Sequence, residues 1–257
     1  MTTPASGSSS RRSSSAGTPD SAVNQAVAAI SEDIASGFYQ PGDQLVEQEC
    51  AQDYQVSRNT LREAFRILQR QQLLVHQPHK GVFLRSFDSE ATAELYVYRR
   101  FVQLAAIDAF AYASEDKQQQ CIDTMIAACD AAYKAQVEGD WRAVGTRNSE
   151  VHLALVDVAG IPKLSEDMRI IMVQSRLAFL SAAHRGDLAA THEPFIDGNR
   201  ELANVLTAVQ QAANTSEEAR DAARRQARAF LHDYLDRAER TVIDLIEGGS
   251  SALGFLR

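Results

Sequence analysis

The sequence has no run approaching the roughly 18 apolar residues that a membrane-spanning helix needs, and its N-terminus lacks the apolar core of a secretory signal peptide. We therefore expect a cytoplasmic protein without a membrane partner. Cysteines are scarce: Cys50, Cys121 and Cys129 make neither a CxxC zinc spacing nor a disulfide framework. We expect all three to be small, buried or half-buried apolar residues.

Signatures of catalysis are missing as well. The sequence contains no HExxH, no GxSxG, no phosphate-binding loop and no motif of paired catalytic carboxylates. We therefore expect that the protein is not an enzyme. What the sequence does contain is enough apolar material, 45% of its 257 residues, for one or two domains with a substantial core.

Positive charge is scarce overall but concentrated in one segment. The chain has 34 acidic and 26 basic residues and a formal net charge of -8, so its bulk charge does not predict nucleic-acid binding. Residues 21–56 hold six acids and no Lys or Arg, whereas residues 57–86 hold six bases and one acid. This segregation confines positive charge to a segment that could face DNA phosphates. A solvated cationic helix face is the alternative.

The first segment of the chain, residues 1–20, reads MTTPASGSSSRRSSSAGTPD. It is rich in Ser, Thr, Gly and Pro and has almost no apolar residues, so burial cannot offset the entropy of ordering it. We expect a disordered tail.

The pattern of residues 21–86 predicts a winged helix-turn-helix, which consists of three helices followed by a β-hairpin wing. Apolar residues at helical spacing predict a first helix that ends near Gly37, and a second helix follows. Ser57 can cap a third helix. Two strand-like runs then flank residues 78–81, as in a hairpin. The third helix has one apolar face, made of Leu61, Ala64, Phe65 and Leu68.

Residues 41–86, PGDQLVEQECAQDYQVSRNTLREAFRILQRQQLLVHQPHKGVFLRS, carry a PG turn, an SRxxLREAxxxL helix and a glycine-ended wing, in that order. This stretch resembles the DNA-binding domain of the GntR family of bacterial transcription regulators. One departure is Gln71-Gln72, which replaces the usual acidic residue plus glycine; we expect an altered helix end and an unchanged fold. The resemblance implies these DNA-binding residues: Ser57, Arg58, Asn59, Thr60, Arg62, His79, Lys80 and Gly81.

Residues 87–257 have an almost wholly helical pattern, which predicts an all-α bundle. We expect loops at Gly139, at residues 160–162 and between His184 and Pro194. The length and order of the helices, together with YRRFVQLAAIDAFA and NSEVHLALVDVAG, resemble the FCD effector domain of the FadR branch of the same family. In the first motif Gln103 stands where Glu is usual. The six expected helices are 89–113, 115–138, 140–158, 161–184, 194–213 and 216–247.

Many FCD domains hold a metal ion with one Asp and three His, and this sequence departs from that set. His152 matches the first histidine, whereas Asn148, Asn199 and Tyr234 stand at the other three positions. Zn²⁺ prefers His, Cys and carboxylate ligands, so we expect no metal cofactor. The expected site is a polar effector pocket lined by Arg99, Asn148, His152, Asn199 and Tyr234.

Two alternatives remain for this pocket. One is a Zn or Ni site in which His192 or His232 completes the ligand set around His152. The other is a bundle that binds no ligand at all.

The resemblance implies a repressor that binds near-palindromic double-stranded operator DNA as a homodimer. Its operator affinity would be controlled by a small organic acid in the helical domain, where Arg99 could hold a carboxylate. A metal-dependent regulator and a constitutive DNA-binding protein with a vestigial effector domain are alternatives. An acid–base enzyme that uses core His, Asn and Tyr side chains is a third.

Overall fold

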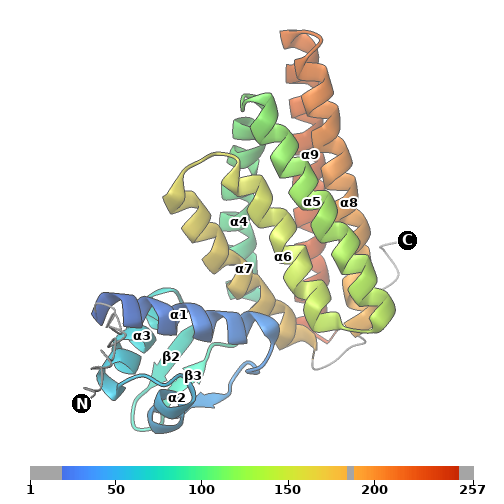
Figure 1. Cartoon of the computed structure of the whole chain (residues 1–257). Coiled ribbons are helices and arrows are strands. Elements are labelled where there is room, and N and C mark those ends of the chain that lie inside the picture. Colours follow the sequence, from blue (N-terminus) through green and yellow to red (C-terminus); the bar gives the residue numbers. More distant parts are fainter. Residues whose placement is uncertain (1–18, 184–187, 249–257) are drawn as a thin grey trace, which may run out of the picture.

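The computed structural model describes residues 19–183 and 188–248, and Figure 1 shows them as a small N-terminal module beside an upright bundle of helices. Helix α1 (Pro19–Ser36) begins inside the segment that was expected to be a disordered tail. Proline suits this first helical position, because the N–H that it lacks would have no partner within the helix there. The rest of the expected tail, residues 1–18, lies outside the described residues.

The N-terminal module is the predicted winged helix-turn-helix with one additional strand. After α1 come β1 (Gln44–Leu45), α2 (Glu47–Asp53), α3 (Arg58–Arg70), β2 (Leu74–Gln77) and β3 (Gly81–Leu84). The strands form an antiparallel sheet in the order β1-β3-β2. The sequence did not predict β1, because a strand of two residues is too short to show an alternating pattern.

The apolar face of α3 forms the core of this module. The four predicted face residues are buried, and α3 packs on α1, whose Ile30 and Ile34 are fully buried. In the turn that precedes α3, Gln55 has a left-handed φ of 53°. The tight turn sets the angle between α2 and α3 and leaves the opposite face of α3 in solvent.

Both ends of α3 are fixed by local contacts. At the start, the Ser57 hydroxyl caps the helix by accepting a hydrogen bond from the Thr60 backbone N–H at 3.1 Å. At the end, Gln72 adopts a φ of 56°, a conformation that glycine adopts more easily. The Gln72 side-chain oxygen accepts a hydrogen bond from Arg85. The Gln71-Gln72 departure therefore alters the helix end and leaves the fold intact.

The helical module contains the six predicted helices. None of the helices in the described part of the chain is long and apolar enough to cross a membrane. The helices are α4 (Ser89–Ala111), α5 (Glu115–Glu138), α6 (Trp141–Asp157), α7 (Pro162–Ala183), α8 (Leu188–Ala213) and α9 (Glu217–Ile246).

Helix α8 begins earlier than predicted. The sequence placed its start at Pro194, since proline favours the first turn of a helix. The backbone is already helical from Leu188, so the prediction of a loop between His184 and Pro194 is wrong for most of that segment. Proline has a φ compatible with a helix, but inside a helix it removes one hydrogen bond and its ring crowds the carbonyl group four residues earlier. Helix α8 as a whole packs along α5 and α9 (Figure 1).

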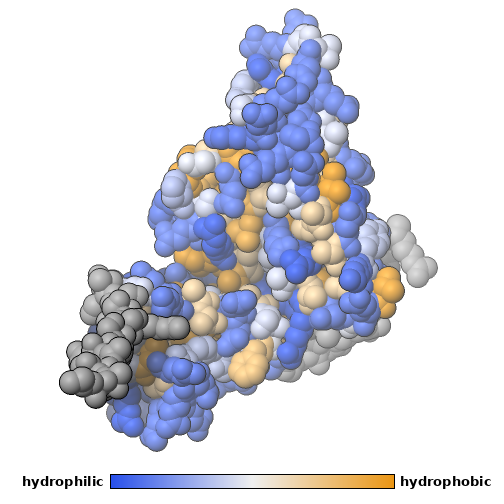
Figure 2. All heavy atoms as spheres, viewed as in Figure 1, coloured by the Kyte–Doolittle hydropathy of each residue, from blue (hydrophilic) through white to orange (hydrophobic). Residues whose placement is uncertain are grey.

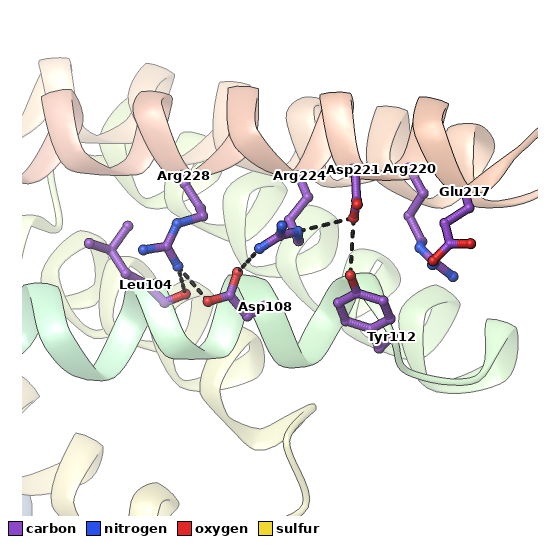
Figure 3. Close-up of polar contacts among 8 residues, drawn as sticks. All are labelled: Leu104, Asp108, Tyr112, Glu217, Arg220, Asp221, Arg224 and Arg228. Atoms are coloured by element: carbon purple, nitrogen blue, oxygen red, sulfur yellow. Dashed lines mark hydrogen bonds and ion pairs between the residues drawn. The ribbon is translucent and has the colours of Figure 1, made fainter.

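Figure 3 shows the charged residues that join α4 to α9. Arg228 and Arg224 of α9 both donate to the carboxylate of Asp108 on α4, at 2.5 and 2.7 Å. Directly after the end of α4, the Tyr112 hydroxyl donates to Asp221 of α9 at 3.0 Å. These contacts are partly exposed, so each stabilises little by itself. Together they fix the register of the two helices that flank the centre of the bundle.

The two modules meet along α7. Helix α1 packs on α7, and one hydrophobic core continues from the N-terminal module into the bundle. Gly37, directly after α1, lies so close that an added Cβ would be 3.5 Å from Leu180 of α7. The Phe87 backbone N–H, between the modules, donates to the Ser181 hydroxyl at 3.1 Å. The expected domain boundary at residues 86 and 87 falls between β3 and α4, and its status as a limit of independent folding stays a prediction.

Candidate functional site

The first half of α3 presents a polar and cationic surface. Arg58, Asn59 and Arg62 are exposed on the face opposite the core. Thr60 is half-buried, and its hydroxyl lies 2.8 Å from that of Ser57. Of the predicted DNA contacts on this helix, three side chains therefore extend into solvent, and the other two form the helix cap.

Arg62 is oriented by the preceding helix. Its Nε donates to Oε2 of Glu47 on α2 at 2.8 Å, and the two side chains are 54% and 39% exposed. An exposed pair of this kind contributes only about 0.2–1 kcal/mol to stability. A base edge or phosphate can therefore replace the carboxylate at little cost. Sequence motifs did not identify Glu47, because a tertiary contact between two short helices leaves no spacing signal.

The wing tip is a tight turn between β2 and β3. His79 has a φ of 64° and Gly81 a φ of 111°, and the Lys80 backbone N–H donates to the Gln77 carbonyl at 3.1 Å. The Gln44 side chain of β1 donates to the Lys80 carbonyl at 2.7 Å and braces the turn. His79 and Lys80 are exposed. The turn thus presents a cation and an imidazole beyond the sheet, as a phosphate-contacting wing needs.

A cavity of about 80 Å³ lies inside the helical bundle, and four of the five predicted effector residues line it. They are Arg99 from α4, Asn148 and His152 from α6, and Tyr234 from α9. The fifth, Asn199 of α8, is buried beside them. The structure therefore brings the five residues together from four helices, while their role as effector ligands stays a prediction.

These side chains form a chain of polar contacts. Asn199 donates to Oδ1 of Asn148 at 3.3 Å, and the Tyr234 hydroxyl donates to Oδ1 of Asn199 at 2.9 Å. The same hydroxyl lies 3.4 Å from Nε2 of His152, whose Nδ1 lies 2.9 Å from Oε1 of Gln103. Since this amide oxygen only accepts, Nδ1 is assigned the proton and Nε2 the lone pair. Gln103, in place of the usual Glu, gives the imidazole a neutral partner.

Two buried arginines bring positive charge to the cavity. Arg99 is 5% exposed and lies over the Tyr96 ring at 5.3 Å, and its Nε has no hydrogen-bond partner among the described residues. Arg176 of α7 is 8% exposed and lies over the Phe179 ring at 5.7 Å. The sequence did not single out Arg176, because an arginine in an amphipathic helix is ordinarily exposed.

The surroundings of the cavity disfavour additional positive charge. Burial, reinforced by the charge of Arg99, lowers the pKa of His152 well below its usual 6.5, so the imidazole is neutral at pH 7. Burial, together with the charge of Arg142, lowers the pKa of Arg176 to about 10. Arg176 therefore remains protonated at pH 7.

Two glycines inside helices allow the cavity walls to approach each other. A Cβ on Gly198 of α8 would lie 2.5 Å from the ring of Tyr234, and a Cβ on Gly145 of α6 would lie 2.4 Å from Nη1 of Arg176. Sequence reasoning missed both. Their signal was available, since glycine within a helix is disfavoured by roughly 1 kcal/mol relative to alanine and often marks a close approach.

The donor set does not fit the metal that the resemblance implies. Asn148, Asn199 and Tyr234 are neutral and His152 is the one imidazole among them, whereas Zn²⁺ prefers His, Cys and carboxylate ligands. His232, one proposed replacement, is 51% exposed and lies 3.6 Å from Asp236. In the described part of the chain, no three His, Cys, Asp or Glu side chains gather as a metal site would require. The side chain of His192, the other replacement, lies outside the described residues.

Comparisons with known proteins agree with this geometry. Residues 22–84 match the bacterial regulatory proteins of the gntR family. The fold resembles a solved protein described as a transcriptional regulator GntR from Rhodococcus sp. RHA1, with 28% identity, a TM-score of 0.70, and coverage of 87% of this chain and 98% of that one. It also resembles E. coli McbR/YncC, with 18% identity, a TM-score of 0.69, and coverage of 86% and 96%; this likeness concerns the fold alone.

A curated relative is the Nta operon transcriptional regulator of Aminobacter aminovorans, which is 25% identical over 143 residues. The match covers 56% of this chain and 66% of that regulator. The family match over the winged helix-turn-helix and the similarity to these regulators support one coarse conclusion. Residues 22–84 match the gntR family over the winged helix-turn-helix, and the chain as a whole is similar to transcriptional regulators of that type.

Replacing Arg62 by alanine should weaken binding to a cognate DNA site by about 1–3 kcal/mol if the guanidinium contacts a base edge. Thermal stability should barely change, because the ion pair with Glu47 is exposed. Arg70→Ala is the matched control, since Arg70 ends the same helix and borders a cleft against α4 and α7. A band-shift titration in which Arg62→Ala binds as tightly as the wild type contradicts the assignment.

Acidification should destabilise the protein through His152. The folded state lowers the pKa of this imidazole, so protons bind preferentially to the unfolded chain once the pH falls below 6.5. The stability that the neutral His152 contributes is thus present above pH 6.5 and is lost as the pH falls below that value. His152→Gln should show a shallower loss of melting temperature on acidification, whereas replacement of the exposed His232 by Gln should follow the wild type. If the melting temperatures of wild type and His152→Gln fall equally on acidification, His152 is not the group responsible.

Proposed function

We propose that the chain is a repressor that binds near-palindromic operator DNA as a homodimer and releases it when a small organic anion occupies the bundle cavity. In this proposal the helical module is an effector domain of the FCD type, as in the FadR branch of the gntR family. The protein would act in the cytoplasm without a metal cofactor. Its partners would be double-stranded DNA, a small organic acid and a second copy of itself.

The observation that carries the proposal is the buried charge of the cavity. Arg99 reaches the cavity with a buried Nε that has no hydrogen-bond partner among the described residues. A buried cation with an unused donor is stabilised by an anion of matching geometry, and a carboxylate can accept two parallel hydrogen bonds from a guanidinium. The neutral His152, Asn148 and Tyr234 add groups that can hydrogen-bond the rest of such a ligand.

On DNA, the exposed face of α3 would enter the major groove, with Arg58, Asn59 and Arg62 towards the bases. The wing tip with His79 and Lys80 would contact the flanking backbone. Two half-sites one helical turn apart would require two copies of the module. A coupling of about 1–3 kcal/mol between effector and DNA binding would be sufficient to change operator occupancy.

The second copy would dock on an apolar surface of α4. Val97, Tyr98 and Phe101 are 46%, 48% and 73% exposed and lie within little more than one helical turn. We name these three residues the α4 surface. Figure 2 shows apolar side chains gathered over the region of α4 and α7 on this side of the molecule. Exposed apolar patches of this kind commonly mark interfaces, and a two-fold dimer would pack the α4 surface of one copy against the α4 surface of the other.

Small carboxylates should raise the melting temperature, whereas EDTA should leave it unchanged. The rise follows from mass action, because a ligand that binds only the folded state stabilises it. Acetate, pyruvate and succinate are suitable probes in a thermal-shift titration, and Arg99→Met should abolish or strongly reduce the rise. Stoichiometric Zn or Ni in protein purified without a tag, lost together with stability on chelation, contradicts the proposal and favours the metal-dependent alternative.

Sedimentation should report about twice the 28.2 kDa mass of one chain. Phe101→Glu should shift the protein towards the monomer, because burying a carboxylate in an apolar interface is unfavourable. Val137→Glu is the control, since Val137 is 87% exposed but lies on α5. A wild-type protein that is a monomer at micromolar concentration and binds DNA as a single module overturns the dimer proposal.

A further inference from the structure

Helix α7 is the element that contacts both the cavity and the DNA-binding module. One side of it, with Met172, Ser175, Arg176 and Phe179, borders the cavity. The same helix packs against α1 of the N-terminal module. A change at the cavity wall is therefore one helix away from the winged helix-turn-helix.

Arg176 spans this distance with a single side chain. Its Nε donates to the carbonyl oxygen of Ala35 at 3.2 Å. Ala35 lies in the last turn of α1, where carbonyl groups have no partner within the helix and the helix dipole is negative. The last turn of α1 contains no basic residue of its own. Arg176 therefore provides the cation that this helix end favours.

The opposite edge of the same guanidinium faces the cavity. A Cβ on Gly145, which lines the cavity, would lie 2.4 Å from Nη1 and 3.0 Å from Nη2 of Arg176. The two Nη groups thus lie directly over a glycine in the cavity wall. Because the guanidinium is planar and rigid, a displacement of its Nη edge also displaces the Nε that bonds Ala35.

A second side chain of α7 bonds to the end of α3, the helix proposed to enter the major groove. Gln174, two residues before Arg176, donates from Nε2 to the carbonyl oxygen of Gln71 at 2.8 Å. Gln71 is the residue that ends α3. The C-terminal ends of α1 and α3 are therefore both bound by donors from one turn of α7. Loss of the Arg176 contact would leave the module attached through the contact at α3.

We infer that Arg176 couples the cavity to the DNA-binding module, by exchanging its bond to the Ala35 carbonyl for a bond to an anion in the cavity. This inference rests on the proposed function and specifies how the effector acts. A carboxylate at the Nη edge draws the guanidinium towards the cavity, and α1 loses the cation at its C-terminal end. The winged helix-turn-helix then loosens against α7, and the spacing of two recognition helices in a dimer is no longer fixed.

Arg99 provides a matched control. It is also a buried arginine of the cavity, but it lies on α4 with its guanidinium over Tyr96 of the same helix. Arg99→Met and Arg176→Met each remove one positive charge from the same cavity. They differ in the contact with α1, so effects on ligand binding and effects on coupling can be separated.

The first experiment uses the full chain without ligand or DNA. Hydrogen exchange of the backbone amides at the C-terminal end of α1 should be several-fold faster in Arg176→Met than in the wild type, and unchanged in Arg99→Met. Gly145→Ala should also accelerate it, because the added methyl group would clash with the Nη edge and displace the guanidinium from the Ala35 carbonyl. Arg176→Lys should restore protection in part, since an ammonium group can donate to the carbonyl. Equal exchange in Arg176→Met and Arg99→Met overturns the inference.

The second experiment measures coupling on a DNA site selected from a random pool by the wild-type chain. The readout is the ratio of DNA Kd values with and without a saturating carboxylate probe, with saturation judged by thermal shift. The ratio should be about fivefold or more for the wild type. It should be one for Arg176→Met, which a merely structural role would not produce. If Arg176→Met saturated with the probe shows the same ratio of DNA Kd values as the wild type, Arg176 does not couple the cavity to the DNA-binding module.

The two proposals fail in different ways. A wild-type chain that selects no DNA, or that binds none of acetate, pyruvate and succinate, removes the proposed function or its effector class. The exchange experiment still decides the inference about Arg176, because it needs neither DNA nor ligand.

Discussion

The burial of two guanidinium groups beside one small cavity is the constraint on which the account depends. A charge that is removed from water is costly unless it is paired, and the neighbours of Arg99 and Arg176 on the cavity wall include the neutral Asn148, His152 and Tyr234. Burial, reinforced by the charge of Arg99, lowers the pKa of His152 and keeps it unprotonated. A dication would add to this positive charge, whereas an anion would offset it. The amide and phenol groups of Asn148, Asn199 and Tyr234 suit an organic anion better than a metal ion.

Much of the fold could be predicted from the sequence, because the relevant signals are local. The helices follow from apolar periodicity, and the start of α3 follows from the capping chemistry of Ser57. Strand β1 and the early start of α8 could not be predicted in this way. Two residues show no period, and a local rule that starts a helix at proline does not detect a helix that begins at Leu188.

The candidate site shows the same division. Four of the predicted effector residues line the cavity, because they lie on the inward faces of α4, α6 and α9. Arg176 and the contact between Glu47 and Arg62 were missed, because each joins elements that are distant in sequence. The mid-helix glycines were visible in the sequence. Gly145 becomes informative only when Arg176 is seen to lie over it.

The central claim is that the cavity selects negative charge, and a competition between charged and neutral ligands of one shape tests it most directly. Ligand-observed NMR on the untagged protein, mixed with acetate, pyruvate and succinate and with their neutral amides, reports which molecules bind. The account predicts binding of a carboxylate and none of its amide, with the signal lost in Arg99→Met. Equal binding of a carboxylate and its amide, or equal signals in wild type and Arg99→Met, would contradict it.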